Sequence, residues 1–245
     1  MTSKYPYTEK WPFVAVLLFY QAFLALMVGV YGYKGSFLML NGLHAGWLDA
    51  PVFLLTHLGD ALILASLLGL LFVRKHPDVV LLMVVVVILT GLFGQLLKNT
   101  LFDMWDRPLR VFGEDSSVHI MYHYRLFHNS FPSGHSITVA AALTALVMSV
   151  GFQKYQQVLL ALLVAAVSYS RIYVSAHFPG DVLAGTVLGV AGALILTAWL
   201  RPLLQSWLKQ WPNPALRRLK IILTVAGLAG MIGGCWMISE YLMQM

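Results

Sequence analysis

Long apolar runs constrain this chain more than any other feature of its sequence. A helix of about 20 apolar residues is long enough to cross the roughly 30 Å hydrocarbon core of a bilayer. The chain is 59% hydrophobic and 11% charged, whereas about a quarter of the residues in a soluble domain are charged. We therefore predict an all-α, polytopic transmembrane bundle. Its seven predicted spans lie near residues 12–33, 51–73, 79–98, 134–152, 156–176, 182–203 and 219–242.

Lysine and arginine divide unevenly between the two ends of these spans. Ten lie on the side of the N-terminus, and six lie on the other side, where three of them belong to the candidate site. Basic residues are enriched in cytoplasmic loops, so we expect the N-terminus in the cytoplasm and both the candidate site and the C-terminus outside. The ten are Lys4, Lys10, Arg74, Lys75, Lys154, Arg201, Lys209, Arg217, Arg218 and Lys220. The six are Lys34, Lys98, Arg107, Arg110, Arg125 and Arg171.

The first residues and the single cysteine indicate how the N-terminus is processed and whether the chain can form a disulfide. Residues 1–10 lack the apolar stretch and small-residue cleavage site of a removable signal peptide, so we expect residues 11–33 to remain as an uncleaved anchor. Cys235 has no partner for a disulfide within the chain and is expected to pack as a small apolar side chain. The compact size and the absence of organelle signals favour a bacterial inner membrane.

Polar and glycine residues precede and enter the second apolar run. Residues 35–48 are too short and glycine-rich to span, and we place them at the outer surface, where they could form a half-buried amphipathic segment. Asp49 and Pro51 predict the start of a helix. His57 and Asp60 are three residues apart and share one helical face. Ionisable groups at membrane depth usually face a bundle interior or a cavity, so the two are interpreted either as a hydrogen-bonded structural pair or as support for a site.

The longest polar segment covers residues 99–130, which we call the collar. A structureless loop of this length is uncommon and usually functional, so we expect the collar to cover the candidate site and to select the head group of a substrate. His119 and His123 have the i, i+4 spacing that could bind zinc in a helix, but no HExxH-type glutamate or cysteine accompanies them. We therefore expect histidines that lie on the surface or pack in a lid rather than a metal site. The side chains expected to shape selectivity are Tyr122, Tyr124, Phe127, His119, His123 and His128, and those interpreted as solvated charges are Asp103, Asp106, Glu114 and Asp115.

Two polar clusters lie at the edges of apolar runs, where a membrane span meets water. One is residues 131–135, with the sequence FPSGH, and the other is residues 170–181, with the sequence SRIYVSAHFPGD. Phosphate transfer without a metal needs cations for the equatorial oxygens, a nucleophile, a group that orients it and an acid for the leaving oxygen. Arg171 and Arg107 can bind phosphate oxygens bidentately, while Lys98 adds a point charge.

The remaining parts of such a site come from the ends of two apolar runs. Ser133, Gly134 and His135 begin the fourth run, where free backbone N–H groups and the positive helix end form an anion site. His177 precedes Asp181 by four residues, so the carboxylate can accept the proton of one ring nitrogen and leave the other as a nucleophile. His135 would protonate the leaving oxygen and then activate a water. A lone histidine is more often structural, but this combination favours phosphate chemistry.

Two of these segments resemble a known family. Residues 132–135 and 170–181, with the patterns PSGH and SR-x5-H-x3-D, are similar to the second and third signature motifs of the type-2 phosphatidic acid phosphatase superfamily, which includes the vanadium haloperoxidases. The resemblance covers roughly residues 50–200. It implies a helical bundle and metal-independent dephosphorylation. It also implies a phosphohistidine at His177 and a general acid at His135.

The first signature motif and the number of spans depart from the family pattern. The family usually has Lys, six residues and then Arg-Pro, whereas eight residues separate Lys98 from its counterpart Arg107 in this chain. Arg110 is a second candidate phosphate ligand. The family core has six spans, so the resemblance implies a core near residues 50–203 and an additional span at 219–242. We expect residues 1–245 to form a single integral-membrane domain.

The resemblance implies a membrane lipid phosphatase that hydrolyses a lipid phosphate or diphosphate. Candidate substrates are undecaprenyl pyrophosphate, phosphatidylglycerol phosphate, phosphatidic acid and lipid A phosphates. The alternatives are a lipid phosphotransferase that uses the same phosphohistidine and, as the polar pair in the second run suggests, a lipid transporter or lipid-binding protein. Haloperoxidase activity fits a membrane-embedded chain less well. We expect no metal or other cofactor and no nucleic-acid partner, and the oligomeric state stays open.

Overall fold

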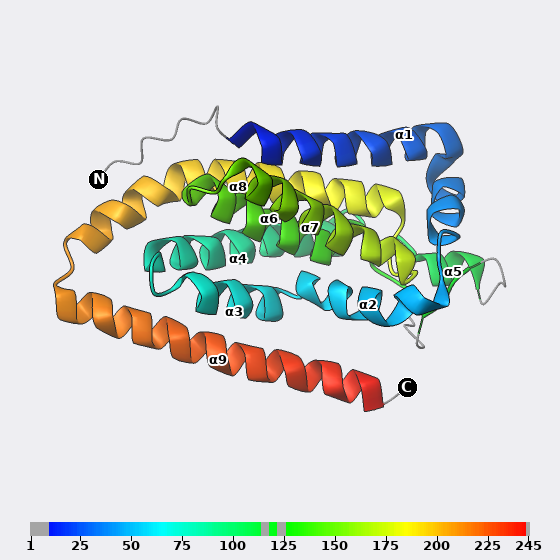
Figure 1. Ribbon diagram of the computed structural model, residues 1–245. Coiled ribbons are helices and arrows are strands. Elements are labelled where there is room, and N and C mark those ends of the chain that lie inside the picture. The colour runs from blue at the N-terminus through cyan, green and yellow to red at the C-terminus, as the bar shows by residue number, and fades with distance from the viewer. Residues whose placement is uncertain (1–9, 114–117, 122–125, 244–245) are drawn as a thin grey trace.

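The computed structural model describes residues 10–113, 118–121 and 126–243, and in these ranges the regular elements are helices (Figure 1). The prediction of an all-helical bundle is confirmed, and the chain is a multi-pass membrane protein. The helices are α1 (Trp11–Asn41), α2 (Gly46–Thr56), the short 3-10 helix η2 (His57–Gly59), α3 (Ala61–Phe72), α4 (Pro77–Thr100), α5 (Pro108–Phe112), α6 (Gly134–Ser149), α7 (Lys154–Tyr173), α8 (Pro179–Lys209) and α9 (Asn213–Met243).

The predicted spans differ in length and in continuity. Within the described ranges, five helices are long and apolar enough to cross a membrane by themselves, namely α1, α4, α7, α8 and α9. The second predicted span is broken, because residues 46–59 and α3 meet at an angle of 79°. Asp60 lies at this break with an extended backbone (φ −72°, ψ 125°). The fourth predicted span corresponds to α6, which has only 16 residues.

Helix α6 forms the centre of the bundle, and its residues from Ser136 to Val147 are all buried. It packs most extensively against α8 and α4. A Cβ atom on Gly185 or Gly189 of α8 would lie 2.6 Å from a backbone carbonyl oxygen of the Ser133–Ile137 turn. These glycines therefore let α8 approach α6 closely, as small residues do in membrane helices. Both glycines therefore serve packing within the chain.

Helix α9 lies at the periphery of the bundle, against α3 (Figure 1). A Cβ atom on Gly234 would lie 2.5 Å from the side chain of Ile63, and one on Gly230 would lie 2.2 Å from Ser66. The glycines of the last predicted span therefore also serve packing within the chain. Most of the large apolar side chains of α9 are exposed on its other face, as expected for a lipid-facing helix.

Helix α1 bends at Gly32, whose backbone (φ 70°, ψ 177°) is one that only glycine adopts without strain. Beyond the bend, α1 turns across the end of the bundle and buries Phe37 and Asn41 (Figure 1). Much of the surface segment predicted over residues 35–48 is thus the last part of α1. The predicted helix start at Asp49 is wrong, because α2 begins at Gly46. The carboxylate of Asp49 accepts a hydrogen bond from the hydroxyl of Tyr173 instead.

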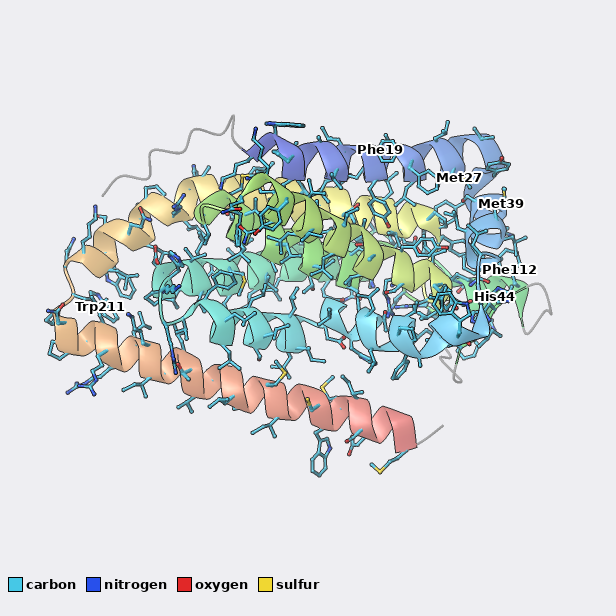
Figure 2. The ribbon with its side chains drawn as sticks, in the orientation of Figure 1. Phe19, Met27, Met39, His44, Phe112 and Trp211 are labelled. Atoms are coloured by element: carbon cyan, nitrogen blue, oxygen red, sulfur yellow. The ribbon has the colours of Figure 1, made fainter. Side chains whose placement is uncertain are left out.

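The two ends of the bundle differ in charge and in structure. At one end, which we call the basic end, Lys10 donates to the carbonyl of Val150 at 2.7 Å and Lys220 donates to the carbonyl of Arg74 at 3.0 Å. At the other end, which we call the site end, lie the collar, α5 and the bent part of α1 (Figure 1). Trp211 lies at the basic end, while His44 and Phe112 lie at the site end (Figure 2). Lys4 and Arg125 of the predicted charge pattern lie outside the described residues.

Candidate active site

The two polar clusters of the sequence meet at the site end of the bundle. His177 lies in the loop between α7 and α8 and is 2% exposed, and Arg171 in the last turn of α7 is 1% exposed. The backbone N–H of Ser133 donates to the carbonyl of Asp181 at 3.0 Å, which joins the start of α6 to the start of α8. The structure thereby brings all eight predicted site residues together: His177, His135, Asp181, Lys98, Arg107, Ser133, Gly134 and Arg171.

Asp181 holds His177 by one ring nitrogen. Its Oδ2 atom lies 3.3 Å from Nδ1 of His177 and also accepts hydrogen bonds from the hydroxyl of Ser130 at 2.5 Å and the backbone N–H of Phe178 at 2.9 Å. The hydroxyl of Tyr33 donates to the other carboxylate oxygen. A carboxylate only accepts hydrogen bonds, so Nδ1 carries the ring proton and Nε2 keeps a free lone pair.

Arg107 faces that lone pair. Its NH1 atom lies 3.4 Å from Nε2 of His177 and 3.1 Å from the carbonyl oxygen of Ala176. Its Nε and NH2 atoms donate to the carbonyls of His128 and Asn129 in the collar at 2.7 and 3.2 Å. A single guanidinium therefore joins the collar to the α7–α8 loop beside the candidate nucleophile.

The environment of His177 favours its neutral form. Burial has the largest effect, and the charges of Arg107, Arg171 and Lys98 add to it, so the pKa of His177 lies well below its usual value. Burial disfavours the charged form of a histidine, and nearby cations act in the same direction. Near pH 7 the ring is therefore a neutral base among three cations.

The long interval between Lys98 and Arg107 does not keep the two apart from His177. Helix α4 ends at Thr100, and the backbone that follows pairs with the second half of the collar. Ser130 donates its N–H to the carbonyl of Trp105, and Arg107 donates its N–H to the carbonyl of Phe127, both at 2.9 Å. Arg110, the alternative phosphate ligand, is exposed on α5.

Space for an anion lies at the start of α6. Ser133 has an extended backbone (φ −70°, ψ 114°), and the helix begins at Gly134. A Cβ atom on Gly134 would have no described atom within 4 Å, so the space beside this glycine is open. The N–H groups and the positive dipole of a helix N-terminus favour a negative group there.

The broken second span supplies contacts that the motifs alone do not reveal. Nε2 of His135 lies 2.9 Å from Oδ1 of Asp60, and Nδ1 of His57 lies 2.8 Å from Oδ2 of the same carboxylate. NH1 of Arg171 donates to the hydroxyl of Thr56 at 2.6 Å. The predicted pairing of His57 with Asp60 is confirmed, and Asp60 also contacts a residue of the second motif.

Sequence reasoning missed three residues of this site, which are Tyr33, Ser130 and Thr56. Tyr33 follows the bend at Gly32, and a Cβ atom on Gly180 would lie 2.3 Å from its ring. Nothing in the spacing of a tyrosine at the end of an apolar run predicts a partner so far along the chain. Ser130 stands just before the second motif, and this proximity was the only signal available for it.

His119 joins the collar to the rest of the site end, whereas the side-chain contact of His128 lies within the collar. His119 contacts Asp49 through Nε2 at 2.9 Å, and its ring stacks on that of His44 with centroids 4.1 Å apart. His128 contacts Asp106 at 3.0 Å and is exposed. Several predicted collar residues lie outside the part of the chain that the structure describes: Glu114, Asp115, Tyr122, His123 and Tyr124.

The bundle is that of a polytopic membrane protein, and the arginines and histidines at its site end form a candidate anion site. Residues 79–205, just over half of the chain, match the PAP2 superfamily. The chain belongs to that superfamily, and the resemblance seen in the motifs is confirmed.

Three known proteins are similar to this chain in sequence or in structure. A stretch of 60 residues is 40% identical to an undecaprenyl-diphosphatase of Sulfolobus acidocaldarius and covers 24% of this chain but only 28% of that protein. The crystal structure of LpxE from Aquifex aeolicus is similar in fold, with a TM-score of 0.59, 24% identity and coverage of 66% of this chain and 93% of that one. A PAP2-type phosphatidylglycerolphosphate phosphatase from Bacillus subtilis gives a TM-score of 0.51 at 26% identity, covering 77% of this chain and 96% of the other.

Proposed function

We propose that this protein is a membrane lipid phosphatase that hydrolyses a lipid phosphate or diphosphate without a metal, through a phosphohistidine at His177. The observation that carries the proposal is the setting of that ring. Its Nδ1 faces Asp181, while its Nε2 faces Arg107 at 3.4 Å. A neutral nucleophile surrounded by fixed cations suits a reaction in which charge spreads over the equatorial oxygens of a phosphoryl group.

In the first step, Arg107, Arg171 and Lys98 bind the phosphate oxygens, and the N–H groups at the start of α6 bind another. The lone pair on Nε2 of His177 attacks phosphorus. The bond from phosphorus to the leaving oxygen breaks, and its electron pair stays on that oxygen, which takes a proton from His135. Asp181 stabilises the positive charge that develops on the His177 ring.

In the second step, a water molecule replaces the leaving group. His135, now neutral, takes a proton from this water as its oxygen attacks phosphorus. The bond from phosphorus to Nε2 breaks, and its electron pair returns to His177. Inorganic phosphate is released, and both histidines regain their starting protonation states.

A lipid substrate fits the position of the site. The cluster lies where α4 and α7 end, α6 and α8 begin and the collar starts, so a head group can enter while its tail remains in the bilayer (Figure 1). The names of two relatives, an undecaprenyl-diphosphatase and a phosphatidylglycerolphosphate phosphatase, also denote removal of phosphate from a lipid. We propose that the collar selects among undecaprenyl pyrophosphate, phosphatidylglycerol phosphate, phosphatidic acid and lipid A phosphates.

We further propose a bacterial inner membrane with the basic end in the cytoplasm and the site outside. Basic residues at the described loops of the basic end support this orientation, because such residues favour the cytoplasmic side. Labelling of single cysteines introduced at Trp211 and at Phe112 in a Cys235→Ser background, in cells treated with a membrane-impermeant reagent, tests it. Labelling at position 112 alone is the expected result.

The proposed activity is tested by phosphate release from the purified protein in detergent. The four lipid classes are compared in the presence of EDTA, with His177→Ala as the control. Release that is insensitive to EDTA and absent from the variant is the expected result. Transfer of phosphate to an added lipid acceptor, with none to water, would favour the phosphotransferase. Tight lipid binding with no turnover would favour a transporter.

A further inference from the structure

The break in the second span places an acidic side chain beside the second motif. Helix η2 ends at Gly59, the backbone of Asp60 is extended, and α3 leaves at 79° to the preceding helix pair. The carboxylate of Asp60 thereby lies 2.9 Å from His135 and is 21% exposed. A Cβ atom on Gly59 would lie 2.7 Å from the His135 ring, so that ring packs directly on the broken backbone.

We propose that Asp60 is a positioning residue for His135, which fixes the tautomer and direction of the ring so that protons are exchanged at Nδ1. This inference rests on the proposed phosphatase function. It assigns a role to the broken second span, which lies outside the three signature motifs.

The tautomer follows from the chemistry of the contact. The carboxylate of Asp60 only accepts hydrogen bonds, so Nε2 of His135 carries a proton in both charge states of the ring. The proton that moves is then the one on Nδ1. The protonated ring gives it to the leaving oxygen, and the neutral ring takes one from the attacking water at the same atom.

His57 holds the carboxylate from its other side. Its Nδ1 lies 2.8 Å from Oδ2 of Asp60, while His135 contacts Oδ1. The ring of His57 packs in turn against that of Phe53 in a T-shaped pair, with centroids 4.9 Å apart at 80°. Two contacts on two different oxygens fix the plane of the carboxylate, so loss of His57 should loosen the alignment of His135 without removing the acceptor.

The test uses phosphate monoesters that share one apolar tail and carry leaving groups from alkyl alcohols to nitrophenols. The full-length protein is purified in detergent, and the rate of the first step is measured as the burst of released alcohol or phenol. Asp60→Asn replaces the acceptor by an amide that can donate to Nε2 and hold the opposite tautomer. We expect a loss of about 10²-fold for alkyl leaving groups and only a few-fold for nitrophenols, which need no acid.

Three further variants make the result specific. Asp60→Glu keeps a carboxylate and should restore part of the alkyl rate. His57→Gln should give the same dependence on the leaving group with a smaller loss. Asp78→Asn makes the same chemical change on an aspartate at the basic end, where it contacts Gln205, and should leave the rates unchanged.

The outcomes separate this inference from the proposed function. No phosphate release by the wild-type protein from any ester would refute the phosphatase itself. Normal wild-type release, with a loss in Asp60→Asn that is equal across leaving groups or absent, would overturn the role of Asp60. If Asp60→Asn does not fold, as judged by its melting temperature and its elution from a sizing column, His57→Gln decides. A steeper dependence on the leaving group supports the inference, and an unchanged one overturns it.

Discussion

The two histidines of the site are held in opposite ways. His177 and its partner Asp181 lie four residues apart, and side-chain exposures of 3% and 0% show that both are sealed from solvent. His135 lies in α6 and its partner Asp60 at the break between η2 and α3, and their side chains are 24% and 21% exposed. A nucleophile benefits from a dry, fixed setting, whereas an acid–base group must reach both a leaving group and a water. We call His177 with Asp181 the His177 half and His135 with Asp60 the His135 half. The comparison predicts that substitutions in the His177 half lower the rate with every substrate. Substitutions in the His135 half should lower the rate by an amount that depends on the leaving group.

The largest effect is expected from His177→Ala. Removal of the nucleophile should lower turnover by on the order of 10⁴-fold or more, since knockouts of nucleophiles in other hydrolases have effects of this size or larger. The loss should be the same for alkyl and nitrophenyl leaving groups, as measured by phosphate release. Appreciable turnover by a folded variant would remove His177 from the proposed role.

Arg107→Ala should have the next largest effect. Loss of one preorganised donor to the transferring group typically lowers kcat by about 10²–10³-fold. Arg107→Lys keeps the charge but loses the bidentate fork and should recover only part of the rate. Kinetics of Arg110→Ala sharpen the test, because a larger loss there than in Arg107→Ala would make Arg110 the phosphate ligand.

His135→Ala should distinguish the role of the acid from the role of the nucleophile. The rate of the first step should fall by about 10²-fold or more for alkyl leaving groups, which need a proton, and much less for nitrophenols. Burst kinetics over a series of esters give this dependence directly. Equal losses across the series would argue against His135 as the acid.

The fall in activity on the acid side of the pH profile depends on the protonation of His177. Because the pKa of His177 is lowered by burial and by the cations around it, the ring stays neutral as the pH falls through the ordinary histidine value of about 6.5. The acid limb of kcat/KM should therefore lie below that value. In Arg107→Ala one cation is gone, so the pKa should rise and the limb should move to higher pH with the same substrate. A limb that stays in place would contradict the electrostatic account.

Tyr33→Phe should have the smallest effect of this series. The variant removes one of the donors to Asp181 while Ser130 and the Phe178 N–H remain. We expect a few-fold loss of kcat and about 1 kcal/mol of stability, the usual contribution of one hydrogen bond. Tyr31→Phe is the matched control, since Tyr31 is 48% exposed two residues earlier on the same helix. Identical behaviour of the two variants would remove Tyr33 from the support of Asp181.

The sequence alone determined the class of fold and predicted most residues of the candidate site. Apolar runs, basic loops and short motifs are local patterns, so the helices, the two ends and the pair of His177 and Asp181 could be predicted without coordinates.

Only the tertiary structure decided which distant side chains complete the site. The contact of Asp60 with His135 depends on the break between η2 and α3, and the contact of Tyr33 with Asp181 depends on the bend at Gly32. Neither partner is close in sequence, and hydropathy carries no information about which helices become neighbours. These contacts form because α6, α8 and the bent part of α1 pack around one end of the bundle, where buried polar groups must find partners to offset the cost of leaving water.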